Sequence, residues 1–115
     1  VRLPKHLRVW GVDSGVRHHV GGGDYGSVRT AAFMGRELVR AHLKDTSADH
    51  PKASLPHLVH LSPSELSGLV GALPETQRGS DFLAAHPGGH GDAVTAVDPS
   101  RDYGVRAAAL HPVNE

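Results

Sequence analysis

Apolar side chains recur at helical spacing in the first third of the chain, between positions 25 and 42. Charged side chains in this stretch fall mostly on the other faces. The inward stripe comprises Tyr25, Val28, Ala31, Ala32, Gly35, Leu38, Val39 and His42. Steps of three and four residues are typical of an amphipathic α-helix that lays one face on a core. The pattern therefore predicts a helix of about five turns.

A short apolar run precedes this helix and predicts a different element. Its β-forming residues are Val9, Trp10 and Val12. Such a run, ending at a Gly/Asp/Ser cluster, indicates a short buried strand. Three glycines at 21–23 then allow a sharp turn, because glycine adopts positive φ without a Cβ clash. Asp24 or Ser27 is expected to cap the helix that follows. Residues 9–43 are thus predicted as strand, Gly-rich turn and long helix.

The middle of the chain has weaker periodicity and clear start and stop signals. Residues 45–56 are rich in Asp, Ser, Thr and Pro and cannot sustain an apolar face, so 45–61 is predicted to be a linker. Ser62, Pro63 and Glu65 then form a capping-box pattern with proline at the first helical position. A short helix is expected from there to about residue 70, ended by Gly71.

Two further helices are expected in the last third of the chain. One opens at Pro74, places Phe82 and Leu83 on the core, and ends at the Pro-Gly-Gly of residues 87–89. The other covers 103–111 with Val105, Ala108 and Ala109 inward and breaks at Pro112. Between them, residues 93–97 fit an extended segment and residues 98–102 a polar turn.

Composition narrows the range of partners. The 115 residues suit one small domain, although 22 of them are Gly or Pro and aromatics are scarce. Twelve basic and twelve acidic residues leave no net charge, which gives no reason to expect a nucleic-acid partner. No apolar run approaches the length of a membrane span, and no signal-peptide pattern is present, so a soluble protein that does not bind membranes is expected.

Ten histidines raise the alternative of a metal-binding module. The candidate pairs are His18-His19, His57 with His60, and His86 with His90. Their spacings match no zinc set, the chain has no cysteine, and no His-Glu-x-x-His occurs. Ordinary surface or capping histidines are the favoured interpretation, and we predict no metal site.

Longer motifs carry a family resemblance. Its first part comprises residues 11–18 (GVDSGVRH), 20–22 (VGG), 24–29 (DYGSVR) and 32–36 (AFMGR). Its second part follows in the same order at residues 73–76, 79, 82–83, 94–95, 98, 101, 103, 105–107 and 111–112. These motifs resemble the segment after the catalytic region in L-arabinokinases of the GHMP sugar-kinase superfamily, which are related to galactokinases. The resemblance covers most of the chain.

This resemblance implies a larger parent protein. The parent would be a two-lobed α/β (α+β) sugar kinase in the cytoplasm that uses ATP and Mg²⁺ to phosphorylate the anomeric hydroxyl of a free sugar. The motif at 20–29 favours L-arabinose over galactose. Residues 1–44 would end the first lobe, 45–61 would link the lobes, and 62–115 would open the helical start of the second lobe. The remaining lobes, the sugar and ATP are then the expected partners.

The resemblance assigns few site residues inside this chain. The family's phosphate-binding loop, catalytic Asp and sugar-binding motif have no counterpart here, so no catalytic or substrate-binding residue is assigned. Asp13 in particular is not given the catalytic role. The isolated chain is expected to be inactive, and a noncatalytic structural or binding module is the alternative function.

Three arginines and the Gly-rich turn are candidates for ligand-binding groups. Galactokinases place an Arg shortly before a His at the start of the second lobe, which makes Arg106 the candidate for cofactor binding. A solvated helix face is its competing interpretation, and Leu110 departs from the basic residue of that pattern. For Arg17 and Arg29, a salt bridge or a domain-interface contact is expected in preference to a catalytic role. Residues 21–23 match no phosphate-loop motif, which favours a tight turn over a phosphate contact.

Overall fold

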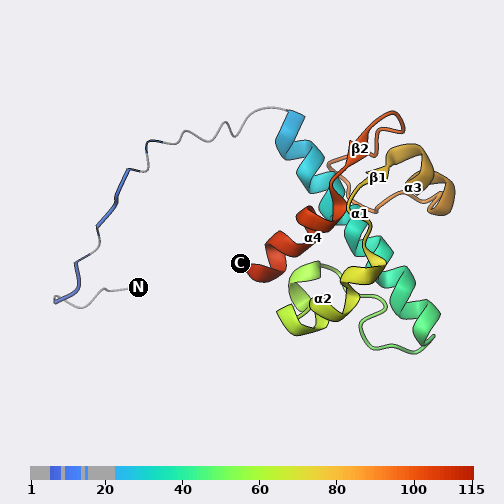
Figure 1. The fold of residues 1–115 in the computed structure, drawn as a ribbon, viewed down its shortest axis with the longest axis horizontal. Helices are drawn as coiled ribbons and strands as arrows, with labels where there is room; N and C mark the ends of the chain where they lie inside the picture. The colour runs from blue at the N-terminus through green and yellow to red at the C-terminus, as the bar shows by residue number, and fades with distance from the viewer. Residues whose placement is uncertain (1–5, 9, 14, 16–22) are drawn as a thin grey trace.

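Helix α1 (Gly23–Thr46) is the longest element of the described chain, and α4 packs across it (Figure 1). The computed structural model describes residues 6–8, 10–13, 15 and 23–115. In those residues the order after α1 is η1 (Leu58–His60), α2 (Pro63–Leu69), η2 (Val70–Ala72), β1 (Gln77–Arg78), α3 (Gly79–Ala85), β2 (Asp102–Tyr103) and α4 (Val105–Asn114). Figure 1 shows α4 crossing α1. Elements β2 and η2 also contact α1, while α2 contacts α4 and α3 contacts β1.

The predicted long helix is confirmed, and its predicted buried face is confirmed in part. Ala31, Gly35 and Val39 of the predicted stripe are buried. Tyr25 and Val28 of the same stripe are 64% and 53% exposed, whereas Met34, outside it, has no exposed surface. Apolar side chains occur on several sides of α1, so helical periodicity alone does not choose among them. The choice is made by α4, which packs on α1 where Gly35 meets Ala109 and Val105. Leu38 is only half-buried.

The start of the structure also corrects the sequence interpretation. Residues 10–13 are not in a strand, and Trp10 and Val12 are 80% and 90% exposed. A strand needs a neighbour for its backbone hydrogen bonds, and in the described residues only β1 and β2 pair with each other. Glycines 21 and 22 lie outside the described residues. Gly23 begins α1, so Asp24 and Ser27 lie within the helix and not at its cap.

The segment predicted as a linker is irregular, yet it is part of the core. Ala53, Leu55, Leu58 and Leu61 are all at most 6% exposed and join the cluster that α1 and α4 bury. Within the described residues, the two predicted lobe portions therefore share one hydrophobic core. Their assignment to different lobes of a larger protein stays a prediction.

Helix α2 begins as the sequence predicts. Glu65 N donates to Ser62 Oγ at 3.3 Å and Ser62 N donates to Glu65 Oε2 at 2.8 Å, which completes the capping box. Hydrogen bonds from Lys52 and Ser62 lower the pKa of Glu65 to about 2, so an ionised carboxylate holds the box. Helix α2 ends at Leu69, and Gly71 lies in the 3-10 turn η2 that follows.

Removing the cap should have a measurable cost. Ser62→Ala is expected to lower the free energy of unfolding by about 1 kcal/mol, because two backbone N–H groups depend on the box. Ser64→Ala is the matched control, since Ser64 is exposed in the same turn, and it should cost under about 0.5 kcal/mol. Urea unfolding followed by circular dichroism measures both. Equal losses would contradict the capping role.

The helix expected from Pro74 begins five residues later. Gln77 and Arg78 instead form β1, which pairs antiparallel with β2 in the register Gln77 to Tyr103. Gly79 N then donates to Arg101 O at 2.8 Å and Ser80 N to Pro99 O at 3.0 Å, so partners distant in sequence set where α3 can start. Phe82 is buried as predicted.

Helix α4 confirms the predicted inward face and corrects both of its ends. Val105, Ala108 and Ala109 are buried, but the helix starts at Val105 and continues through Pro112 to Asn114. Pro112 lies in the last turn and lacks the N–H that would bond to the carbonyl of Ala108, and the helix continues only two residues beyond it. The expected turn at Asp98 is confirmed, with Ser100 N and Oγ both donating to Asp98 Oδ1, whereas residues 93–97 form no strand.

None of the helices in the described residues combines the length and apolar character that crossing a bilayer requires.

Candidate functional site

The loop between α3 and β2 is fastened to α1 by a paired ionic contact. Arg29 Nε donates to Asp92 Oδ2 and Arg29 Nη2 donates to Asp92 Oδ1, both at 2.8 Å. This two-pronged geometry is the strong form of an arginine–carboxylate pair. The Asp92 side chain is only 4% exposed. Hydrogen bonds from Arg29 and then from Thr95 hold the pKa of Asp92 well below its usual range, so this carboxylate is an ion-pair partner and not a proton donor.

His90 completes this polar cluster. Its Nδ1 accepts a hydrogen bond from Asp92 N at 3.1 Å, which places the ring proton on Nε2. That nitrogen lies 3.3 Å from Thr95 Oγ1, and Thr95 Oγ1 donates to Asp92 Oδ2 at 2.7 Å. His90 is 3% exposed, and burial lowers its pKa. The acceptor role of Nδ1 and the lowered pKa both favour the neutral imidazole.

A second arginine, Arg36, connects α1 to two other segments of the chain. Arg36 Nη1 donates to Pro56 O at 2.8 Å, and Arg36 Nη2 donates to His90 O at 2.7 Å. Arg36 also bonds to Glu37 Oε1, and its guanidinium lies 4.7 Å from the centre of the Phe33 ring. Arg36 is only 9% exposed, so its guanidinium makes its hydrogen bonds inside the protein. Its role in this structure is to hold neighbouring segments on α1.

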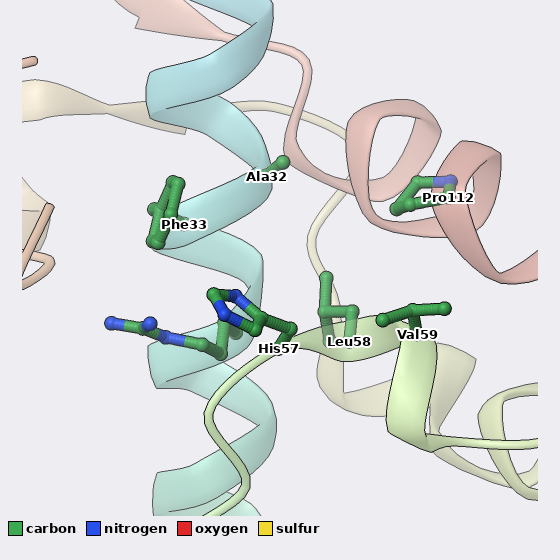
Figure 2. Close-up of a pocket in the computed structure, with 7 residues that line it drawn as sticks. Ala32, Phe33, His57, Leu58, Val59 and Pro112 are labelled. Atoms are coloured by element: carbon green, nitrogen blue, oxygen red, sulfur yellow. The ribbon is translucent and has the colours of Figure 1, made fainter. Parts of the chain in front are cut away.

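Beside Arg36 lies a hollow of about 280 Å³, shown in Figure 2. Ala32 and Phe33 of α1 line one side, while Pro112 of α4 and the segment around η1 line the others. The η1 segment contributes His57, Leu58 and Val59. The walls are mostly apolar, and the residues that line it include no carboxylate. Its polar lining groups are His57 and Arg36, and the Arg36 guanidinium is bonded to Glu37, Pro56 and His90, so the hollow fits an apolar group better than a phosphate.

The structure gives the sequence-predicted residues internal roles. Arg106 Nε and Nη2 both donate to Leu73 O, at 2.9 and 2.7 Å, so this side chain ties α4 to the end of η2. Its role at a cofactor stays a prediction. Asp13 is exposed and accepts a hydrogen bond from Gly15 N. The salt bridge expected for Arg29 is confirmed, whereas Arg17 lies outside the described residues.

The described histidines do not gather into one cluster. His57 and His60 have ring centres 6.1 Å apart, and His86 stacks on Phe82 at 4.7 Å. In the part of the chain that the structure describes, no three His, Cys, Asp or Glu side chains are grouped so that they could hold a metal ion. His18 and His19 lie outside that part.

The sequence interpretation missed Asp92 and Arg36. A buried arginine on α1 gave no signal beyond its place on the helix, and its acceptors are backbone carbonyls that any residue supplies. The segment around Asp92 did carry a signal, because glycines at 89 and 91 flank His90. Both adopt φ +70°, a conformation that glycine favours, and they fold the loop back on α1.

Comparison with known proteins adds one relative. The chain is 36% identical to the L-arabinokinase of Arabidopsis thaliana in an alignment of 137 residues. That alignment includes 100% of this chain and 13% of the relative. It is longer than the 115 residues of this chain, so the relative carries residues within the segment that this chain lacks. No family model matches the chain, and no solved structure matches it. The chain is therefore similar to one segment of a sugar kinase.

Proposed function

We propose that this chain is part of an ATP-dependent kinase that phosphorylates the anomeric hydroxyl of a free sugar, L-arabinose ahead of galactose. The observation that carries the proposal is the 36% identity to an L-arabinokinase along the whole chain. The parent would have the two-lobed α/β fold of the GHMP superfamily, use Mg²⁺ with ATP, and act in the cytoplasm. Because the chain spans 13% of that relative, the active site is shared with residues outside it.

The contribution proposed for this segment is structural. Arg29 is paired with Asp92, and Arg36 is paired with Glu37 and bonded to backbone carbonyls. These contacts attach neighbouring segments to α1. Arg106 is proposed to contact the nucleotide in the parent through Nη1, which its bonds to Leu73 do not use. Trp10 and Val12 are 80% and 90% exposed. Such apolar surface is expected to be covered by the remaining lobes of the kinase.

Activity should depend on the flanking sequence. The 115-residue chain is expected to show no ATP binding in calorimetry and no sugar-dependent ADP release, because the family's phosphate-binding loop and catalytic Asp have no counterpart in its sequence. The product of the complete reading frame should do both, with arabinose turned over faster than galactose. Arabinose-dependent ADP release by the 115 residues alone would contradict the inactivity. A complete product that phosphorylates neither sugar would overturn the proposed function.

A noncatalytic structural module is the second candidate. It is favoured by the internal use of the charged groups on α1, which leaves the described residues without an evident reaction centre. The flanking reading frame distinguishes the kinase from the noncatalytic module. A Gly-Leu-Ser-Ser-Ser loop upstream and a Gly-rich loop downstream support the kinase, and their absence supports the module.

A further inference from the structure

We propose that His90 is a pH-sensitive latch, which holds residues 86–97 against α1 while its imidazole is neutral and releases them when the ring gains a proton. The proposal concerns the described chain itself and does not depend on the proposed kinase activity.

The geometry leaves the ring no place for a second proton. Nδ1 already accepts the amide hydrogen of Asp92 at 3.1 Å. The proton on Nε2 points to Thr95 Oγ1, whose own hydrogen goes to Asp92 Oδ2 at 2.7 Å. An imidazolium donates from both nitrogens and accepts at neither. Protonation would therefore set a ring hydrogen against the Asp92 amide hydrogen inside a site where His90 is 3% exposed.

The same residues connect the ring to both attachments of the loop. The Asp92 carboxylate, which Thr95 orients, holds Arg29 of α1. The carbonyl of His90 accepts from Arg36 of α1 at 2.7 Å. A movement of His90 that relieves the clash therefore pulls on both arginine contacts. Because loops are fixed by few contacts, losing two of them together frees the segment from the helix.

Charges of both signs surround the ring. Asp92 from the loop and Glu37 from α1 favour the imidazolium, whereas Arg29 and Arg36 from α1 oppose it. The Phe33 ring, 5.9 Å away, supplies an apolar wall. Burial is the largest influence, and it lowers the pKa of His90. A histidine in an unfolded chain takes up its proton at about pH 6.5. The unfolded or released loop thus binds protons first, and the latch loses stability as the pH falls below that value.

The test is a nuclear magnetic resonance titration of the ¹⁵N-labelled chain between pH 8 and pH 5. At pH 8 the His90 ring should show its proton on Nε2. Between pH 7 and pH 5, the exchange protection of the Asp92 and Thr95 amides, corrected for intrinsic rates, should fall at least about tenfold, or about 1.4 kcal/mol. Both amides donate within the latch, to His90 Nδ1 and to Asp92 Oδ2.

Two variants separate the latch from general acid sensitivity. His90→Asn keeps a side-chain acceptor for the Asp92 amide and cannot gain a proton, so its protection should be equal at pH 7 and pH 5. His86→Asn changes a histidine of the same loop whose ring stacks on Phe82 instead, and it should retain the wild-type pH dependence. Unchanged wild-type protection, or pH dependence that survives in His90→Asn, would overturn the proposal. If His90→Asn does not fold, a ring proton on Nδ1 of the wild type at pH 8 would overturn it equally.

Discussion

Gly79→Ala should lower the free energy of unfolding by at least about 3 kcal/mol, the upper range for overpacking a core. A Cβ at this position would lie 2.0 Å from Asp98 O and 2.8 Å from Asp98 C. Both atoms belong to the backbone, so no side chain can rotate away. The backbone itself is fixed, because Gly79 N bonds to Arg101 O and Ser80 N to Pro99 O. Chemical unfolding monitored by circular dichroism measures the loss.

Gly71→Ala provides the matched control for this substitution. Gly71 is exposed in η2 and has no atom within 4 Å of an added Cβ. Its replacement should change the free energy of unfolding by less than about 0.5 kcal/mol. If both alanines were tolerated equally, the close packing of α3 against residues 98–99 would be wrong.

Met34→Ala should cost about 2 to 5 kcal/mol, because it removes a fully buried side chain and leaves a cavity between α1 and its neighbours. Val28→Ala on the same helix should cost under about 0.5 kcal/mol, since Val28 is 53% exposed. The sequence pattern alone predicts the opposite order, because Val28 lies in the predicted stripe and Met34 does not. Thermal and urea unfolding of the two variants therefore decide which face of α1 is buried. A larger loss for Val28→Ala would restore the face predicted from sequence.

Much of the candidate site could not be predicted because its contacts join distant positions. Arg29 and Asp92 are 63 residues apart, and Arg36 and His90 are 54 apart. A salt bridge for Arg29 was a sound expectation for an arginine on an amphipathic helix, but no local pattern identifies the partner. The Pro-Gly-Gly of residues 87–89 was predicted as the end of a helix, and Gly91 was not singled out. That the glycines at 89 and 91 present His90 to α1 depends on where the loop packs.

The sequence by itself determined the elements whose signals lie within one or two helical turns. These include the presence of a long helix at α1, the capping box at Ser62 with Glu65, and the inward face of α4 at Val105, Ala108 and Ala109. Such features rest on contacts between residues three or four positions apart, which the sequence displays directly.

Only the tertiary structure decided which residues in and beside the predicted stripe of α1 are buried, where α3 begins, and how the loop around His90 is held. Each of these depends on a partner far along the chain: α4 against Gly35, residues 99 and 101 against the start of α3, and Arg29 and Arg36 against the loop. The physical reason is that apolar burial and hydrogen bonding stabilise any pair of complementary surfaces that come into contact, whatever their separation along the chain. Weakly amphipathic segments with apolar residues on several sides accept more than one such partner until the whole core forms.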